Sequence, residues 1–348
     1  MKIDTNAENL KNYKKYLRIQ EKVEIFLKKQ SYLKTDLPIL SPALIPESYM
    51  EVFETEHRFL DKSQKLYLAP TPELFMKRLL AYGVGSCYYL SKSFRNGELP
   101  SDLHSPEFVI LEYYKVGADH MDIAEELLKM LQYIAKGKKI KYQGKKISLS
   151  KWEKITVAEA FKKYSGINEK ELFDHKLFIN KAREKGYVVY NSSSERSESR
   201  SSRQARTIIY SYEDLWSQIY SQEVEPNLGI NGYPTLIYDY PKEFAVCAKS
   251  NPDKKTVQRF EFYIEGVELG DCYTELTDWK EQKKRMNEEQ LKRKKLKKIA
   301  HPVDKGFIET LKYGLPECAG IAIGFERLAM IFTDTDSINK LRLINISN

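Results

Sequence analysis

A two-residue turn between two strand-like runs places the strongest constraint on what this chain can fold into. In residues 259–278 (RFEFYIEGVELGDCYTELTD), the dipeptide Glu265-Gly266 lies between two runs that contain aromatic and aliphatic side chains. This spacing is typical of an antiparallel β-hairpin. Further strand-like runs lie at 87–94 and 108–116, and helix-like runs accompany them. The sequence therefore predicts an α+β fold in which helices flank a mostly antiparallel sheet.

Helices are expected where apolar residues recur at helical spacing, as they do in residues 8–34. A long charged helix should follow Asp278, and another should span 304–313. Thr71-Pro72-Glu73 is typical of a helix start, with Thr71 as the N-cap. Residues 191–206 lack apolar side chains and are expected to be a flexible insertion within a single domain that covers residues 1–348.

The hairpin brings two carboxylates together. Its expected register pairs Tyr263 with Glu268 next to the turn. Further from the turn, Glu261 then pairs with Gly270, so that both glutamates lie on one face as diagonal neighbours. Adjacent carboxylates repel unless a cation lies between them, and Mg²⁺ with phosphate oxygens suits such a pair. Two solvated glutamates on an exposed face are the alternative.

The run 108–116 carries a carboxylate among aromatic residues. Its period of two places Glu112 on one face with Phe108 and Tyr114. Burial of a carboxylate in such surroundings costs several kcal/mol unless a cation meets it. Glu112 is therefore expected either to pair with an arginine or lysine of the protein or to receive a cationic ligand. This segment alone favours the internal pair.

A third candidate site lies where residues 93–96 (SFRN) lead into a loop that ends at residues 104–108 (HSPEF). Arg95 at a strand end offers a planar fork for a phosphate or a carboxylate. Phe108 could stack on a base. Taken singly, a surface arginine and a core phenylalanine are the alternatives. The common nucleotide-binding motifs, GxxxxGK[ST] and a strand-linked GxGxxG, are missing from the sequence.

Composition excludes several classes of protein. The 348 residues carry a formal net charge of +8, concentrated in 136–154 and 280–298, which suits an acidic partner or solvated faces. No apolar run is long enough for a membrane span, and the N-terminus lacks the apolar core of a secretory signal, so we expect a cytoplasmic protein. Four scattered cysteines and five separated histidines argue against a transition-metal site.

Several segments, in order along the chain, resemble those of class II aminoacyl-tRNA synthetases. LPILSPALIPESYMEVFET, FRN…HSPEFVILEYY and GIAIGFERLAMIF are similar to motifs 1, 2 and 3 of that class. TPELFMKRLL and RFEFYIEGVELGDCYTELTD are similar to segments of its lysyl-type members. VEPNLG and HPVDKGFIETLKYGLPECAG resemble the elongation factor P–lysine ligase family. The resemblance implies the class II synthetase fold and both ATP and Mg²⁺ as cofactors.

The resemblance implies roles around ATP by position. Arg95 would grip the α-phosphate and the substrate carboxylate and thereby serve catalysis together with Arg327. Phe108 and Arg327 would sandwich the adenine ring. Glu261 and Glu268 would hold Mg²⁺. The residues of the motif 2 loop over ATP would be Glu98, His104 and Glu107.

The resemblance also implies roles around a lysine-type amino acid. Glu73 would receive the amino group near the reacting end, whereas the distal ammonium would go to Glu112, Tyr114 and Glu275. Ala322 would narrow the pocket around the α-amino group, which suits an amine on the β-carbon. A small residue in a packed strand is its alternative role.

The implied reaction has two steps: formation of an acyl-adenylate, then transfer to an acceptor amine. Only about thirty residues precede the motif 1 segment, so we expect no anticodon-binding domain, and tRNA is an unexpected acceptor. The resemblance implies elongation factor P as the acceptor and a homodimer built through motif 1. The alternatives are a truncated lysyl-tRNA synthetase paralogue with another acceptor and a catalytically weakened regulatory paralogue.

Some positions depart from the family pattern. Gly97 stands where the family usually has a glutamate, so we assign the role of that glutamate to Glu98. The loop also lacks the arginine that the family normally has just before His104. Asp271 stands in place of asparagine and Cys272 in place of glycine. A carboxylate at position 271 could strengthen ammonium binding or repel the substrate carboxylate. Motif 3 carries Glu326 where aspartate is common.

Overall fold

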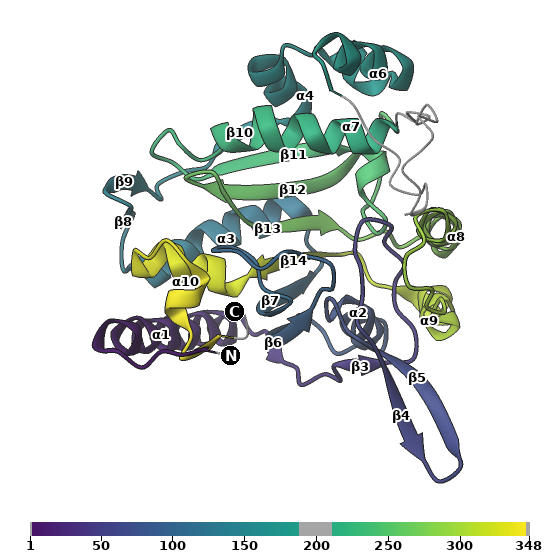
Figure 1. The fold of residues 1–348 in the computed structure, drawn as a ribbon, viewed down its shortest axis with the longest axis horizontal. Helices are drawn as coiled ribbons and strands as arrows, with labels where there is room; N and C mark the ends of the chain where they lie inside the picture. The colour runs from purple at the N-terminus through teal and green to yellow at the C-terminus, as the bar shows by residue number, and fades with distance from the viewer. Residues whose placement is uncertain (1, 188–210, 346–348) are drawn as a thin grey trace, which may run out of the picture.

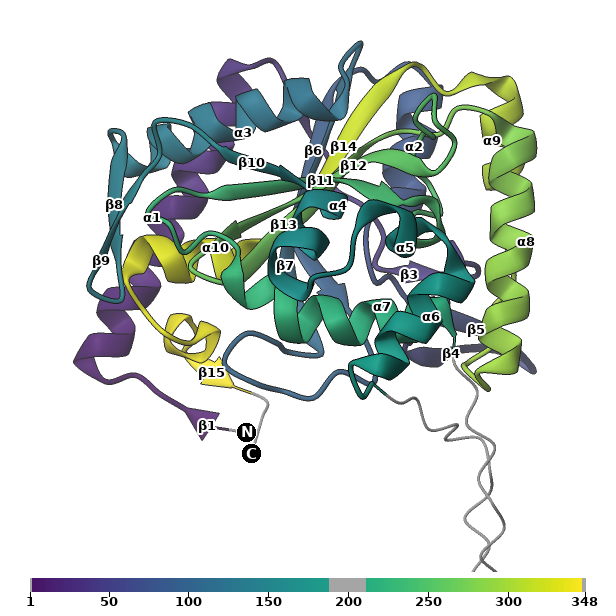
Figure 2. The same cartoon turned by 90° about the horizontal axis from the view of Figure 1, so that it is seen from above.

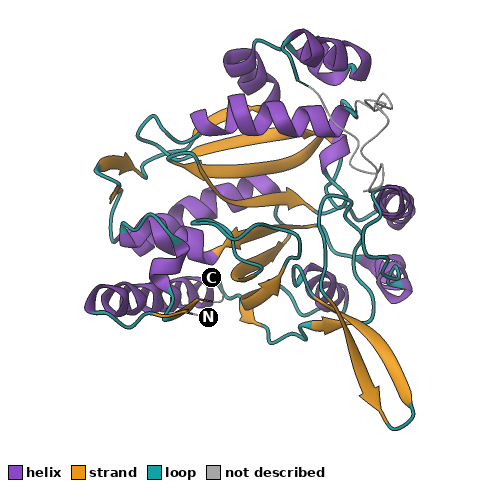
Figure 3. Ribbon diagram, in the orientation of Figure 1, coloured by secondary structure: helices purple, strands orange, loops and turns teal. Residues whose placement is uncertain are grey.

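The computed structural model describes residues 2–187 and 211–345, so the predicted insertion 191–206 lies outside the described residues. An eight-stranded sheet runs through the molecule, and its two outermost strand pairs are parallel while the others are antiparallel (Figures 1 and 3). This arrangement confirms the predicted α+β class. In spatial order the strands are β10 (Glu153–Thr156), β11 (Thr235–Pro241), β12 (Thr256–Ile264), β13 (Val267–Thr274), β14 (Cys318–Gly324), β7 (Glu107–Val116), β6 (Cys87–Phe94) and β2 (Leu33–Lys34).

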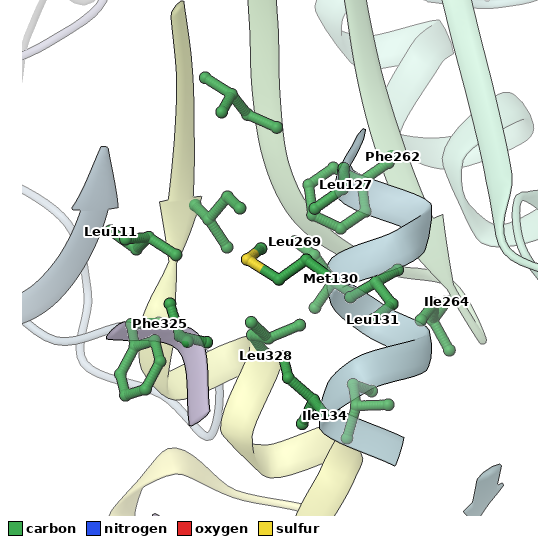
Figure 4. Packing of buried hydrophobic residues seen from close by; sticks show 14 of the residues in the cluster. Leu111, Leu127, Met130, Leu131, Ile134, Phe262, Ile264, Leu269, Phe325 and Leu328 are labelled. Carbon is green, nitrogen blue, oxygen red and sulfur yellow. The ribbon is translucent and has the colours of Figure 1, made fainter. Parts of the chain in front are cut away.

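Three helices cover one face of the sheet: α1 (Ala7–Lys29), α3 (His120–Ala135) and α10 (Phe325–Thr333). Leu127 of α3 and Leu328 of α10 are buried against strand residues such as Leu111 and Phe262 (Figure 4). Full burial of each such side chain contributes about 1.5–3 kcal/mol. This apolar layer anchors the strands that carry the site.

Three other helices pack on the opposite face: α2 (Glu73–Ala81), α8 (Trp279–Lys295) and α9 (Lys305–Gly314). They form a second core that includes Met286, Phe307 and Tyr114. Because side chains alternate along β7, Leu111 lies in the first core, whereas Glu112 and Tyr114 point to the side of α2. The fold thus directs the Glu112 carboxylate away from the largest apolar core.

Smaller elements complete the molecule. A hairpin of β4 and β5 projects from the body in Figure 1, and the view in Figure 2 shows α8 and α9 at one edge. The smaller strands are β1 (Lys2–Ile3), β3 (Leu40–Ser41), β4 (Glu54–Phe59), β5 (Lys62–Leu68), β8 (Lys139–Tyr142), β9 (Lys145–Ser148) and β15 (Ile344–Asn345). The smaller helices are α4 (Val157–Ala160), α5 (Glu169–Phe173), α6 (His175–Glu184) and α7 (Tyr212–Ile219), with π-helical turns at Phe161–Ser165 and Tyr220–Val224 and 3₁₀ turns at Glu225–Asn227, Lys242–Phe244 and Ile338–Leu341.

Helix starts agree with the sequence except at α2. The Asp278 side chain accepts hydrogen bonds from the backbone N–H groups of Lys280 and Glu281, which caps α8. The N-cap of α2 is Pro72 rather than the predicted Thr71, and within the described chain no side chain caps this helix. Proline holds a helical φ without needing a side-chain acceptor, so the helix begins one residue later than expected.

The hairpin between β12 and β13 has the predicted turn but a different register. Glu265 and Gly266 both have positive φ, 52° and 73°, as a tight two-residue turn requires. Tyr263 pairs with Glu268 as predicted, but Glu261 pairs with Asp271 instead of Gly270. A β-bulge between Phe262 and Tyr263 causes this shift, because β13 supplies one more residue than β12 there.

Candidate active site

Two adjoining cavities lie on the sheet face that carries Glu112. The first cavity, of about 80 Å³, is lined by residues that include His104, Phe108 and Arg327. The second cavity, of about 250 Å³, is lined by residues that include Glu73 and Glu112. The wall common to both consists of Arg95, Glu268, Asp271 and Ala322. Residues from motifs 1, 2 and 3 and from the hairpin therefore converge on one place.

The first cavity combines an aromatic ring with two guanidinium groups. The Arg95 guanidinium lies over the Phe108 ring, 5.2 Å from its centroid. Arg327 Nη1 lies 3.3 Å from a Glu268 carboxylate oxygen, and Arg327 Nε donates to the Leu103 carbonyl at 3.0 Å. An aromatic ring and two guanidinium groups in one cavity suit a flat base bound to a polyanion.

The motif 2 loop contributes Glu98 and His104 to the first cavity. Burial, followed by the charge of Arg327, lowers the pKa of His104. Glu107 does not reach either cavity in the described structure, because its carboxylate forms an ion pair with Lys92 at 2.7 Å. Of the three loop residues predicted over ATP, the structure brings two to the cavity.

Glu261 is buried and lines neither cavity in the described structure. One of its carboxylate oxygens pairs with Arg259 at 2.8 Å, and the other accepts a hydrogen bond from the Tyr263 hydroxyl at 2.7 Å. Burial raises the pKa of Glu261, and the charge of Glu268 adds to this effect against the opposing charge of Arg259. The predicted pair of acidic neighbours is therefore close enough to interact, but Glu268 alone of the two lines a cavity among the described residues.

A third carboxylate, Glu225, approaches this pair and was not among the predicted site residues. Burial, with the charges of Glu268 and Glu261, raises the pKa of Glu225 to about 7. In residues 2–187 and 211–345, no group of three or more His, Cys, Asp or Glu side chains is arranged to hold a metal ion by itself. The oxygen donors do suit Mg²⁺ that keeps nucleotide phosphates among its ligands, since Mg²⁺ commonly takes only one or two carboxylates.

The second cavity contains a carboxylate fixed in its ionised form. The Glu73 Oε1 atom lies 2.5 Å from Lys77 Nζ and accepts a hydrogen bond from the Tyr273 hydroxyl at 2.6 Å. Burial opposes ionisation of Glu73, but the Lys77 ammonium and these hydrogen bonds outweigh it and lower the pKa. Lys77 follows Glu73 by four residues on α2, a spacing that brings the two side chains together.

Lys77 also binds Glu275, at 2.5 Å from its Oε2 atom. The Glu275 side chain is fully buried and, within the described structure, does not line either cavity. Burial raises the pKa of Glu275 to about 8, although the Lys77 charge opposes the shift. The structure therefore does not bring Glu275 to the surface on which a ligand ammonium would lie, because an internal lysine stands next to it.

Glu112 is one of several buried carboxylates with an unpaired oxygen in the described residues; Glu47, which also lines the second cavity, is another. Its Oε1 atom accepts a hydrogen bond from the Tyr114 hydroxyl at 2.8 Å, but Oε2 is buried without a hydrogen-bond partner in the described residues. Burial, followed by the charge of Glu73, holds the pKa of Glu112 well above its usual range. The internal arginine or lysine partner favoured by the strand alone is thus missing from the described part of the chain.

Further charges surround the common wall. Asp271 lies 3.6 Å from Arg259, and burial raises its pKa despite that cation. Burial and the charge of Glu73 raise the pKa of Glu47 to about 7. Glu47 and Arg259 were not predicted as site residues. The available signals were the position of Glu47 within the motif 1 segment and the two-residue spacing of Arg259 from Glu261.

Comparison with known proteins agrees with this geometry. Residues 1–344 match the family described as tRNA synthetases class II (D, K and N). The chain therefore belongs to the class II tRNA synthetase family. Over nearly its whole length it is similar to the elongation factor P–(R)-β-lysine ligase of Vibrio atlanticus, at 32% identity over 96% of this chain and 95% of that protein. The protein of the same name from Avibacterium paragallinarum is 31% identical over 95% of this chain and 94% of that protein.

Lysine–tRNA ligases are similar as well. The protein of that name from Carboxydothermus hydrogenoformans is 33% identical over 94% of this chain. The chain spans only 63% of the length of that relative and 65% of the one from Staphylococcus haemolyticus. None of the helices in the described residues is long and apolar enough to cross a membrane.

Proposed function

We propose that this chain is an ATP-dependent ligase that activates lysine or (R)-β-lysine and transfers it to a lysine side chain of elongation factor P. The observation that carries the proposal is the unpaired Oε2 atom of Glu112, which lies at a cavity wall next to the ionised Glu73. A buried carboxylate without a partner is costly, and a ligand ammonium would supply the missing charge.

The first cavity would hold ATP. Phe108 would stack on the adenine ring, and Arg327 would cover its other face. Mg²⁺ would neutralise phosphate charge when bound, with Glu268 as a ligand and with Glu261 and Glu225 as further acidic groups behind it. Among the phosphate contacts, Arg95 is the most important, because it lies on the wall common to both cavities.

The second cavity would hold the amino acid. Glu112 and the Tyr114 hydroxyl would bind the distal ammonium, and Glu73 would bind the amino group nearer the carboxylate. Glu275 would act through Lys77, since Lys77 separates it from Glu73. Asp271 and Ala322 would border the amine at the common wall, where they would influence the choice between an α- and a β-amine.

The two cavities would align the reacting groups. The amino acid carboxylate attacks the α-phosphorus, the bond to the β-phosphate oxygen breaks, and pyrophosphate leaves. The acceptor amine then attacks the acyl carbon, loses a proton and releases AMP. Alignment of the reacting groups and stabilisation of negative charge by Arg95 would accelerate the reaction without a covalent enzyme intermediate.

We further propose that residues 1–348 form one catalytic domain and that the protein acts as a cytoplasmic homodimer. The similarity to lysine–tRNA ligases supports a second candidate, a ligase of the same chemistry that acylates tRNA or another acceptor.

ATP–pyrophosphate exchange tests the activation step. We expect exchange that depends on Mg²⁺ and on α-lysine or (R)-β-lysine; its absence with both amino acids and with close analogues would leave only a regulatory paralogue. The intact mass of elongation factor P, and acid-precipitable lysyl-tRNA in a parallel reaction, then identify the acceptor. Acylation of tRNA alone would replace the first candidate with the second.

A further inference from the structure

Two arginines, Arg342 and Arg285, line neither cavity in the described structure. Each of them instead binds an irregular backbone segment whose residues line one of the cavities. We propose that Arg342 and Arg285 are positioning residues. Arg342 strengthens the affinity of the first cavity for its ligand, and Arg285 strengthens the affinity of the second cavity for its ligand. The identities of the two ligands, ATP and a lysine-type amino acid, rest on the proposed function.

Arg342 ties the end of the motif 2 loop to α10. Its Nη1 donates to the Ser105 hydroxyl at 2.8 Å, and its Nη2 donates to the Glu107 carbonyl at 3.0 Å. The same guanidinium binds Glu326 Oε1 through Nε at 3.0 Å and through Nη2 at 2.5 Å. The other Glu326 oxygen accepts from the Val109 backbone at 2.7 Å, so the loop end, β7 and α10 meet at one cation.

The segment before Arg342 fastens the same loop at a second place. The Ile338 backbone N–H donates to the Asp102 carbonyl at 2.8 Å, and the Asn339 side chain donates to the Ser101 carbonyl at 3.4 Å. Ile338 itself lines the first cavity. Residues 97–106 form neither helix nor strand, so their position depends on contacts of this kind.

Arg285 plays the corresponding part at the second cavity. From α8, its Nη1 donates to the carbonyls of Ala245 and Ala248 at 3.0 and 2.8 Å, and its Nη2 donates to the Ser250 hydroxyl at 3.0 Å. Glu281 on the same helix orients the guanidinium through Nε at 3.0 Å. Residues 244–247, which line the second cavity, belong to the segment that Arg285 holds.

Both contacts depend on the planar fork of arginine. One guanidinium can satisfy several backbone carbonyls at fixed angles, whereas a lysine ammonium cannot reach them all. Without the fork, the wall segment becomes more mobile, and a ligand that binds there must first order it. Because Arg342 and Arg285 hold separate segments, each loss should weaken one ligand and spare the other.

The test uses the full chain with Arg342→Ala and Arg285→Ala, each the matched control of the other. Hydrogen–deuterium exchange of the amides in 97–106 and 244–250 reports wall mobility, and calorimetry reports equilibrium binding of Mg–ATP and of lysine separately. For Arg342→Ala we expect faster exchange in 97–106, roughly tenfold weaker ATP binding and unchanged lysine binding. For Arg285→Ala we expect faster exchange in 244–250 and a loss of roughly tenfold in lysine binding alone.

The proposal is overturned if both variants weaken both ligands equally, or if neither changes amide exchange in its own segment. Arg342→Lys and Arg285→Lys should give intermediate values of the same selective kind, and they carry the test if an alanine variant does not fold. If the wild-type chain binds neither ATP nor lysine, the proposed function fails. The exchange pattern still decides whether each arginine holds its wall.

Discussion

The unpaired oxygen of Glu112 can be removed without changing the size of its side chain. Glu112→Gln keeps the volume and the contact with Tyr114 but cannot acquire a negative charge when an ammonium binds. Hydrogen bonds to charged groups contribute about 1.5–3 kcal/mol, so we expect lysine binding to weaken by roughly ten- to a hundredfold. Calorimetry measures the affinity for lysine, and a separate titration with Mg–ATP measures the affinity for the second ligand.

Glu309→Gln is the matched control, because Glu309 lies at the surface and pairs only with Lys312 among the described residues. We expect it to leave both ligands unaffected. Equal lysine affinity in Glu112→Gln and in the wild type would show that the second cavity does not bind an ammonium through this residue.

The raised pKa values at the second cavity predict a pH dependence. Burial and the charge of Glu73 raise the pKa of Glu47 to about 7, so the empty cavity holds protons that an ammonium ligand must release. An acid whose pKa is higher in the folded state stabilises the protein at low pH, and this stability is lost as the pH rises through about 7. Lysine should therefore raise the Tm more at pH 8 than at pH 6. A larger shift at pH 6 would contradict this assignment of charge.

The contacts of single residues were the least predictable part of the site. Helical spacing brings Lys77 to Glu73, but only the tertiary structure places Glu275 on the other side of the same ammonium. Likewise, Glu107 of β7 forms an ion pair with Lys92 on the neighbouring strand β6, which the sequence of β7 alone does not predict. Such partners come from distant parts of the chain, and the local sequence carries no signal for them.

At the scale of elements, helix capping distinguishes α8 from α2. Asp278→Ala removes an acceptor for two backbone N–H groups at the start of α8 and should cost about 1 kcal/mol of unfolding free energy. Thr71→Ala should cost less than about 0.5 kcal/mol, because Pro72 rather than Thr71 is the N-cap of α2. Urea denaturation of both variants measures the difference. A larger loss for Thr71→Ala would restore the original capping prediction.

Strands were predicted more closely than the register between them. The run 87–94 coincides with β6, and 108–116 lies within one residue of β7, because aromatic and β-branched residues end sharply at polar ones. The bulge that pairs Glu261 with Asp271 was not predictable, since an extra residue in one strand keeps the local composition unchanged. That single shift decides which acidic side chain faces Glu261 at the site.

At the scale of the whole molecule, the edge of the main sheet predicts an assembly. The sheet ends at β2, where Leu33 is 54% exposed, and in the motif 1 segment that follows, Ile39 and Leu40 are 39% and 42% exposed. An open strand edge with apolar neighbours favours association with a second copy. We expect a dimer at micromolar concentration by light scattering and a monomer for Leu33→Glu. A monomeric wild type would contradict the homodimer.

The position of Arg95 over the Phe108 ring has a consequence for the order in which ligands arrive. A purine that stacks on the same face of this ring would displace the guanidinium from it, and Arg95 already lines the second cavity as well. The carboxylate of the amino acid would meet a cation that the nucleotide has just released. The two ligands should therefore show synergy: lysine should bind more tightly to the protein saturated with a non-hydrolysable ATP analogue than to the free protein, and Arg95→Ala should abolish the difference.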